Sequence, residues 1–452
     1  MDLLTSILAF LVALGLLIVV HELGHFWVAR WCGVKVLRFS VGFGRPIARW
    51  VRGPDRTEWV IAAVPYGGYV RMLDERETDS GPIDPADLPR AFNRQPVARR
   101  AAIVAAGPAA NLLLAVFIYF ALNLIGTPDL RPVLSQPAAG TLAAQAGFGE
   151  GDLVLRIDDR QIRSWGDLRW ALLQRASDRA RPQFVVRASD GAERTLRLDL
   201  SSVDTDRSDV DWFGRIGLEP GGGVAIVRAT AHGGAAEQAG VQAGDWIVAI
   251  DGTAVRSGAD VSRLVGARPH QTLQLQIERG GKPMTIQITP TDTVTADGKH
   301  VGRIGIEVGT HFRDTIVVRD GPFGALQRAV ARTWETSSFS LRMLGKMVVG
   351  RASWKNLSGP VTIADVAGQS ARIGPLAYLN FLALVSISLG VLNLLPVPVL
   401  DGGHLLYYAI EVVTGSPPSP KWLELGQRVG IGLLVVLTAL ALYNDLTRLL
   451  FQ

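Results

Sequence analysis

Four long runs of apolar residues divide the chain, and polar stretches of very different length separate them. Each run reaches the roughly 20 residues that a helix needs to cross the hydrocarbon of a bilayer. We therefore expect a polytopic α-helical membrane protein with four transmembrane helices in contact with lipid. The runs are about Leu3–Ala29, Ala101–Ile125, Leu376–Leu395 and Val429–Leu450.

Basic residues in the short loops predict the orientation of these helices, because such residues mark the cytoplasmic side. The segment between the first two runs is rich in arginine, including Arg99 and Arg100, and the last loop carries Lys421 and Arg428. Both segments are expected in the cytoplasm. The long stretch between the second and third runs is then outside. No basic residue precedes the first run, so we expect it to be retained rather than cleaved as a signal peptide.

The first run ends in the sequence His21-Glu22-Leu23-Gly24-His25. Residues four apart share one face of a helix, so His21 and His25 can both present imidazole nitrogens to one Zn²⁺. Glu22 can reach a metal-bound water as general base. In a soluble helix this pattern often has no function. At the end of an apolar run it indicates a catalytic site, because ionisable groups at membrane depth are costly.

A third metal ligand is predicted after the third run. Pro396 and Pro398 cannot continue a helix, and irregular backbone at membrane depth has to line a wet cavity or be shielded by protein. Asp401 follows on the same membrane side and completes a site of two histidines and one carboxylate. His404 is an alternative third ligand, although we expect it to lie in the turn or to support the ligands instead.

The outer segment contains a tandem repeat. Ala146-Gly147, Gly151-Asp152, Ile157-Asp158 and Ser164 recur 93 residues later as Ala239-Gly240, Gly244-Asp245, Ile250-Asp251 and Ser257. This period suits two globular modules with short strands. The pattern is similar to PDZ domains, although the first copy has Asp159 where the second has Gly252. That resemblance implies a peptide ligand, which adds a strand to a sheet edge. A rigid spacer that excludes bulky substrates is the alternative.

Composition narrows the functional classes further. Apolar residues make up 48% of the 452 residues and the formal net charge is +5, with no basic stripe that would indicate nucleic-acid binding. Cys32 is the only cysteine, so no intrachain disulfide and no multi-cysteine metal site can form.

The same patterns predict five regions. They are an N-terminal transmembrane region (1–125), a first PDZ-like α+β domain (126–210), a second one (211–312), amphipathic helices at the outer membrane surface (313–372) and a C-terminal transmembrane region (373–452). Apolar residues at helical spacing after Pro322 indicate the amphipathic helix, with docking inside the protein as the alternative.

The two metal motifs together resemble the site-2 protease family of intramembrane metalloproteases. The resemblance covers essentially the whole chain, through HExxH in the first run and Asn393-Leu-Leu-Pro396-Val-Pro398-Val-Leu-Asp401-Gly402 after the third. It implies that His21, His25 and Asp401 bind Zn²⁺ and that Glu22 is the catalytic base. It also implies that Asn393, Pro396 and Pro398 contact substrate. Gly107, Pro108 and Asn111 match a further family segment, which we expect to pack beside the site.

A β-hairpin is expected after the first run, with its turn at Arg52-Gly53-Pro54-Asp55. The resemblance implies that this hairpin re-enters the membrane and pairs with an unwound substrate through Gly42, Phe43 and Gly44. A cytoplasmic surface hairpin is the alternative.

The resemblance further implies an inner-membrane enzyme of bacteria with periplasmic modules and an active site near the cytoplasm. Its substrates would be trimmed anti-sigma factors and remnant signal peptides, filtered by the PDZ-like pair. A membrane-anchored scaffold with a structural metal is the other class of function. An intact Glu22 and three protein ligands with an open fourth position favour the protease.

Overall fold

A computed structural model describes residues 2–76, 83–203, 212–294, 299–312, 314–350, 353–354 and 357–450. The chain forms two compact units. The first contains the described residues up to 127 and from 319 onward, and the second contains the described residues between 128 and 318. The expected domain boundary at 210/211 and the expected start at 313 lie outside the described residues.

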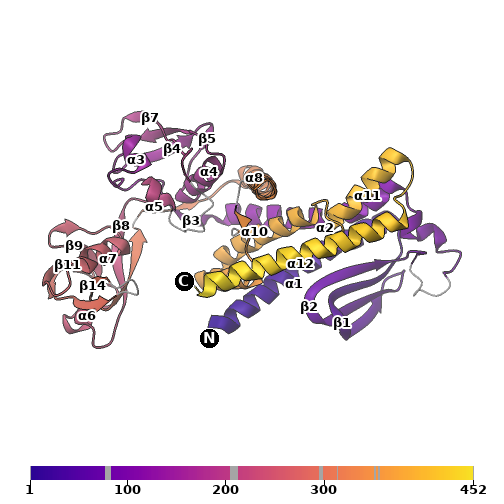
Figure 1. Cartoon of the computed structure of the whole chain (residues 1–452), viewed down its shortest axis with the longest axis horizontal. Helices are drawn as coiled ribbons and strands as arrows, with labels where there is room; N and C mark the ends of the chain where they lie inside the picture. The colour runs from indigo at the N-terminus through magenta and orange to yellow at the C-terminus, as the bar shows by residue number, and fades with distance from the viewer. Residues whose placement is uncertain are drawn as a thin grey trace. The chain divides into compact units, whose positions relative to one another are not determined.

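The first unit is built on four helices that are long and apolar enough to cross a membrane, as the apolar runs predicted (Figure 1). Proline and glycine set several of their ends: α10 and α12 begin at a proline, and α2 ends before Gly126. The four helices are α1 (Asp2–Trp31), α2 (Val97–Ile125), α10 (Pro375–Asn393) and α12 (Pro420–Leu450). A fifth, shorter helix, α11 (Asp401–Thr414), follows the proline-rich loop.

Two further helices complete the packing of this unit. In α8 (Pro322–Val348) the small residues Ala325 and Ala329 are buried, and the helix packs on α2, while Phe323 and Trp334 are exposed. The expected amphipathic helix therefore docks through small side chains and presents large apolar ones outward. The next helix, α9 (Pro360–Ile373), begins where the buried carboxylate of Asp445 accepts hydrogen bonds from the main-chain N–H groups of Gly359, Val361 and Thr362.

The predicted hairpin forms from β1 (Val36–Arg52) and β2 (Thr57–Met72). Both strands bend back on themselves, so that Val41 pairs with both Ile61 and Gly68. The stretch 64–72 pairs along one side with residues 36–43, which makes it an edge of this small sheet. Two single turns of 3-10 helix, η2 (Leu88–Arg90) and η3 (Phe92–Arg94), follow.

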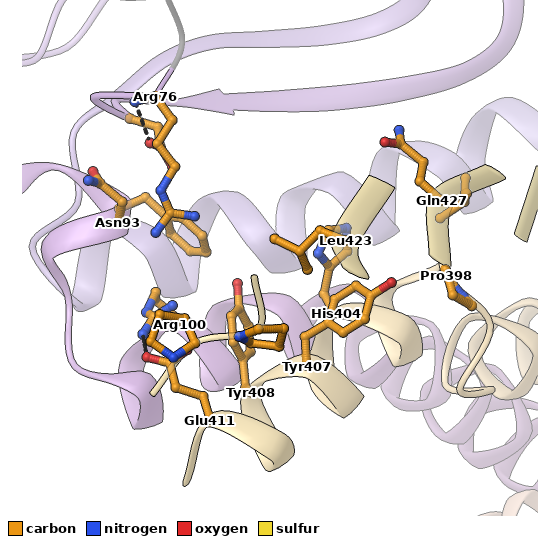
Figure 2. A pocket seen from close by; sticks show the side chains of 15 residues that line it. Arg76, Asn93, Arg100, Pro398, His404, Tyr407, Tyr408, Glu411, Leu423 and Gln427 are labelled. Carbon is orange, nitrogen blue, oxygen red and sulfur yellow. Dashed lines mark hydrogen bonds and ion pairs between the residues drawn. The ribbon is translucent and has the colours of Figure 1, made fainter. Parts of the chain in front are cut away.

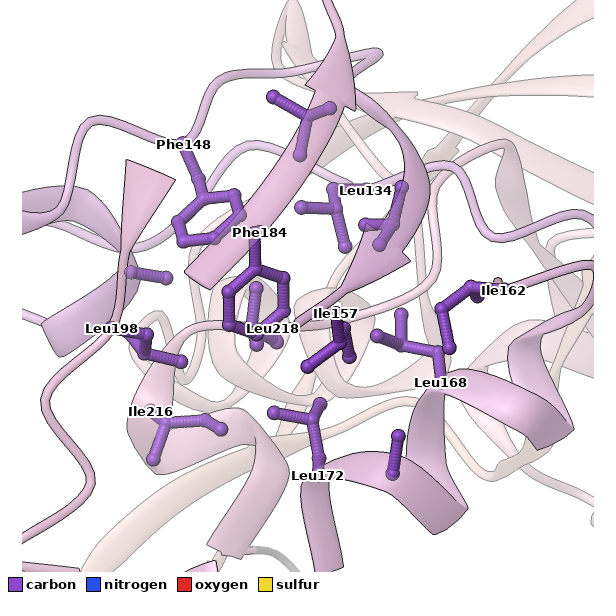
Figure 3. Packing of buried hydrophobic residues seen from close by; sticks show 14 of the residues in the cluster. Leu134, Phe148, Ile157, Ile162, Leu168, Leu172, Phe184, Leu198, Ile216 and Leu218 are labelled. Atoms are coloured by element: carbon purple, nitrogen blue, oxygen red, sulfur yellow. The ribbon is translucent and has the colours of Figure 1, made fainter. Parts of the chain in front are cut away.

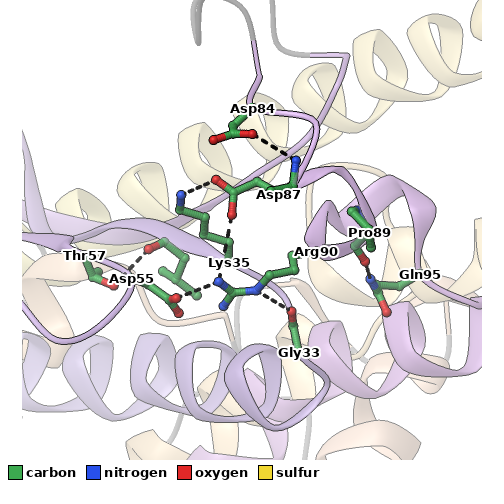
Figure 4. Close-up of polar contacts among 11 residues, drawn as sticks. Gly33, Lys35, Asp55, Thr57, Asp84, Asp87, Pro89, Arg90 and Gln95 are labelled. Carbon is green, nitrogen blue, oxygen red and sulfur yellow. Dashed lines mark hydrogen bonds and ion pairs between the residues drawn. The ribbon is translucent and has the colours of Figure 1, made fainter.

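The start and the turn of the hairpin are both held by ion pairs (Figure 4). Arg90 pairs with Asp55 at 2.8 Å and donates to the carbonyl of Gly33, while Lys35 pairs with Asp87. The hydrogen bond from Arg90 lowers the pKa of Asp55, against the opposing effect of burial. The hairpin is thus anchored to the segment that enters α2.

The second unit contains both repeated modules. The first has a sheet of order β5-β4-β6-β7 and a core around Leu134, Phe184 and Leu172 (Figure 3). Its elements are α3 (Leu142–Gln145), β4 (Leu153–Ile157), β5 (Arg160–Gln161), α4 (Trp165–Ser177), β6 (Gln183–Arg187), β7 (Glu193–Arg197) and α5 (Trp212–Ile216). The strand β3 (Thr127–Leu130) pairs with β16 (Thr315–Val318).

The second module has a sheet of order β12-β11-β9-β8-β15, with β15 at one edge. Its elements are β8 (Gly223–Thr230), α6 (Ala235–Gln238), β9 (Trp246–Ile250), β10 (Thr253–Ala254), α7 (Gly258–Gly266), β11 (Leu273–Arg279), β12 (Lys282–Ile288), β13 (Thr291–Val294), β14 (His300–Arg303) and β15 (Ile306–Phe312).

The repeated residues turn out to be structural. Ser164 and Ser257 accept hydrogen bonds at the N-termini of α4 and α7. Asp152 and Asp245 are buried, and each is held by one arginine and by main-chain N–H groups. The repeat therefore reflects two modules with the same fold.

One assignment from the sequence needs correction. The sequence predicts residues 211–312 for the second module, but Ile216 and Leu218 belong to the core of the first. The equivalent Ile304 lies in the second core, and Gly217 and Gly305 both have positive φ. Each module contains its own Gly-Arg-Ile-Gly segment; in the first module it follows β7, the last strand of that sheet, whereas in the second module β15 still follows it. The late position of this segment in the first module is why spacing alone misplaced the boundary.

Candidate active site

The centre of the first unit contains the two histidines of α1. One helical turn separates His21 and His25, and their rings meet edge to face with centroids 4.8 Å apart. Their Nε2 atoms lie 3.2 Å apart. Both side chains and that of the adjacent Glu22 are buried. The sequence spacing therefore produces the convergence that it predicted.

Asp401 reaches the same point from the other end of the chain. The helix α10 ends at Asn393, the proline-containing loop reverses the chain, and Asp401 is the first residue of α11. Its Oδ2 lies 3.1 Å from Nε2 of His21 and 3.6 Å from Nε2 of His25. Side chains on Gly402 or Gly403 would collide with the backbone of that loop, so the loop folds closely over the start of α11.

The three donor atoms fit a zinc ion. Ligands about 2.0–2.1 Å from a tetrahedral metal lie roughly 3.3–3.4 Å from one another, close to the three separations observed. Two imidazoles and one carboxylate are also a donor set that zinc enzymes use. Among the described residues, this is the one group of histidine, cysteine and acidic side chains that meets the geometry of a metal site. Three protein ligands leave a fourth position for water or substrate.

The second helix forms the wall behind the histidines. A Cβ on Gly107 would overlap the ring of His25 and lie 2.8 Å from Cε1 of His21, so the rings rest against bare backbone. The carbonyl of Ile103 lies 2.8 Å from Nδ1 of His25, and Asn111 lies 3.2 Å from Nδ1 of His21. The close packing expected of the Gly107-Pro108-Asn111 segment is therefore present.

The hairpin lies close to Glu22 at Gly68. A Cβ on Gly68 would lie 3.0 Å from Cγ of Glu22, which places the edge stretch 64–72 beside that side chain. Residues 42–44 instead form the bend of β1: Gly42 and Gly44 have positive φ, and the ring of Phe43 stacks on Tyr69 at 6.1 Å. Gly68 thus lies beside Glu22, whereas a Cβ on Gly42 or Gly44 would meet Ala62 or Val64.

The remaining predicted residues lie in the reversing loop. Asn393 is half-buried at the last position of α10, and Pro396 is exposed. Pro398 packs beneath α12, where a side chain on Gly430 would overlap its carbonyl. Val399 lies two residues before Asp401 and has φ of +90°, a conformation that a β-branched residue adopts only under strain.

A cavity of about 230 Å³ lies next to this loop (Figure 2). Pro398, His404 and Tyr407 line it, so His404 faces the cavity one helical turn beyond Asp401. On another wall Arg100 of α2 pairs with Glu411 of α11 at 2.6 Å and stacks on the ring of Tyr408. This pair could not be predicted from sequence patterns, because the two residues are 311 positions apart.

Comparison with known proteins gives consistent matches over the whole chain. The profile of Peptidase family M50 matches residues 9–437. The protein of Ralstonia nicotianae named "Putative zinc metalloprotease RSc1411" is 46% identical, and the match covers 98% of each chain. The "Regulator of sigma-E protease RseP" of Escherichia coli is 41% identical, again over 98% of each chain.

The solved structures that are similar to this protein match a smaller part of the chain. The PDZ domain of an SdrC-like protein from Listeria monocytogenes is similar to 19% of this chain and to 85% of its own length, at 24% identity and a TM-score of 0.17.

Proposed function

The chain belongs to peptidase family M50, and we propose that it is a zinc metalloendopeptidase that cleaves peptide bonds within transmembrane segments of single-span proteins. The convergence of His21, His25 and Asp401 beside Glu22 carries this proposal. These residues lie where the apolar helices α1 and α2 pack together, so the reaction takes place among helices able to cross a membrane.

His21, His25 and Asp401 would hold the zinc ion. When bound, zinc polarises the scissile carbonyl and makes hydroxide available near neutral pH. Glu22 takes the proton of the attacking water and passes it to the leaving amide nitrogen as the C–N bond breaks. Water adds to the carbonyl carbon, and the products are a carboxylate and an amine.

The free edge of the hairpin supports strand addition by the substrate. A helical substrate has to unwind before its peptide bond is accessible, and the edge stretch 64–72, whose recorded pairing is with residues 36–43 on one side, lies close to Glu22 at Gly68. We assign the first contact with the unwound segment to the backbone around Gly68. Asn393, Pro396 and Pro398 would contact the substrate from the reversing loop.

The Escherichia coli relative is named a regulator of sigma-E protease. On this similarity we propose that the chain takes part in regulated intramembrane proteolysis in a sigma-E response. Trimmed anti-sigma factors and remnant signal peptides are the substrates that we propose for this chain. The basic loops favour an inner-membrane protein whose active site faces the cytoplasm and whose modules lie in the periplasm.

The second module has the features of a peptide-binding site. A cavity of about 700 Å³ runs along the edge strand β15 and helix α7, lined by residues that include Ile306, Val308 and Val265. An extended peptide could add to β15 and fill this groove. Peptide binding and exclusion of untrimmed substrates are compatible uses of the same module.

Zinc content and cleavage test the central proposal together. Glu22→Gln protein should retain zinc and lose cleavage of a reconstituted transmembrane peptide, whose scissile bond mass spectrometry identifies in the wild type. If the zinc-loaded Glu22→Gln protein cleaves at the wild-type rate, Glu22 is not the catalytic base. Zinc without any cleavage by wild type, on several transmembrane peptides, would favour the scaffold alternative.

A blocked groove tests the role of the second module. Ser262 lines the cavity on α7, and Ser262→Trp should abolish peptide binding measured by fluorescence anisotropy. Binding that persists in this variant would show that the groove is not the binding site. If wild type binds no peptide and still refuses untrimmed substrate, the module acts as a size filter alone.

A further inference from the structure

Asn111 has an unusual environment in the wall behind the metal site. Its side chain is fully buried on α2, with Nδ2 lying 3.2 Å from Nδ1 of His21. Its Oδ1 is buried as well and has no hydrogen-bond partner among the described residues. A buried amide oxygen without a partner is costly, so this arrangement calls for an explanation.

The chemistry of a metal-bound histidine supplies that explanation. His21 faces Asp401 and His25 with Nε2, so metal binding requires the lone pair on Nε2 and a proton on Nδ1. Nδ1 is then a donor and needs an acceptor opposite it. The NH₂ group of Asn111 cannot accept a hydrogen bond, and the two donors would oppose each other.

Rotation of the amide by 180° about χ2 resolves this conflict. It exchanges Nδ2 and Oδ1, so the carbonyl oxygen takes the place opposite Nδ1 of His21. The backbone of Asn111 need not move, and it is held from α10 by Ser386, whose hydroxyl donates to the carbonyl of Asn111 at 2.7 Å. His25 already has an equivalent acceptor in the carbonyl of Ile103.

We propose that Asn111 is a positioning residue whose side-chain oxygen accepts the Nδ1–H of His21 and so fixes the tautomer that presents Nε2 to the metal. This inference rests on the proposed zinc site and adds a partner for the first ligand.

Zinc affinity measured by chelator competition on the full-length protein tests the inference. Asn111→Leu keeps the volume and removes the acceptor, and we expect its Kd for zinc to rise about 10- to 100-fold, as for other partners of metal-bound histidines. Asn111→Asp keeps an acceptor and should retain tight binding. Asn123→Leu is the matched control, because Asn123 lies on the same helix about 18 Å away and donates to Ala325.

The outcomes separate this inference from the proposed function. If wild type binds zinc and Asn111→Leu binds it equally well, Asn111 does not position His21, although the metal site stands. If wild type binds no zinc, the proposed function itself fails. Thermal unfolding without metal reveals whether Asn111→Leu protein is folded. If it is not folded, the zinc affinity of Asn111→Asp protein is the test, and weak zinc binding by folded Asn111→Asp protein overturns the inference. The Co²⁺-loaded wild type and Asn111→Asp proteins should share one tetrahedral absorption spectrum.

Discussion

The ring of His25 occupies the space that a side chain on Gly107 would fill: a Cβ there would lie 2.6 Å from Cε1 of His25. At Gly107 the two histidine rings therefore rest against the backbone of α2. A single methyl group at this position is enough to displace a proposed ligand.

Gly107→Ala should accordingly abolish most activity. A displacement of about 1 Å at a reacting centre can lower the rate about 10²-fold, and we expect zinc affinity to fall as well. Gly15→Ala on α1 is the matched control, since a Cβ there meets nothing within 4 Å. That control should retain activity and gain about 0.5–1 kcal/mol of stability. Equal cleavage rates for the two variants would contradict the packing described for Gly107.

The strain at Val399 leads to a second prediction. Its φ of +90° costs on the order of 1–3 kcal/mol, which exceeds the roughly 0.5–1 kcal/mol that a glycine loses in entropy. Val399→Gly should therefore unfold at a higher temperature, while kcat falls because the loop restrains Asp401 less. Val397→Gly, in the same loop with ordinary φ, should only lose stability. A lower unfolding temperature for Val399→Gly would show that the residue is not strained.

The ion pair between Arg100 and Glu411 joins α2 to the helix that begins with Asp401. Both side chains are nearly buried, at 9% and 15% exposure. Removing one partner leaves a buried charge, so Glu411→Gln should lower the free energy of unfolding by about 3–5 kcal/mol. Replacing both, as Arg100→Met with Glu411→Leu, should recover most of this loss. Chemical unfolding in detergent measures both effects, and an additive double variant would contradict the pairing.

Asp245 predicts how the second module responds to acid. Burial raises the pKa of its carboxyl, but hydrogen bonds from Arg279 and from the N–H of Gln242 outweigh this and lower the pKa below the ordinary value. A group with a lowered folded pKa stabilises above its unfolded pKa, about 3.9, and that stability is lost as the pH falls through the folded pKa. Hydrogen exchange in β9 should stay slow to about pH 4 and accelerate below it.

Asp245→Asn is the control for this acid response. The variant should exchange faster in β9 at neutral pH, because the ion pair with Arg279 is gone, and it should lose most of the extra acceleration below about pH 4. An unchanged acid profile would mean that other carboxyl groups dominate the acid response of the module.

The residues that could be predicted from the sequence are those whose position follows from local geometry. His21 and His25 share a helix face by spacing, and Asp401 follows a break that Pro396 and Pro398 enforce. The apolar runs located the four long helices to within a few residues at most ends, although α12 begins nine residues before the expected Val429.

The residues that escaped prediction depend on how distant segments pack. The proximity of Gly68 to Glu22 and the pairing of Arg100 with Glu411 arise only when helices and hairpin meet. The strain at Val399 arises from the conformation of the loop between α10 and α11, and a valine in the sequence does not indicate a positive φ. The boundary of the first module was predicted too early in the chain. Ile216 packs in the core of the first module although it lies well after β7, and the spacing of the repeat does not indicate this.

The distance in sequence between Asp401 and the two histidines has a consequence for biosynthesis. A ribosome has made nearly nine-tenths of the chain before it adds the third proposed ligand, 376 residues after His25 (401 − 25). By then both repeated modules are already complete. An unfinished or prematurely terminated polypeptide therefore carries His21 and His25 without Asp401. The proposed hydrolytic centre can form only after the modules to which we assign the proposed filter have been made.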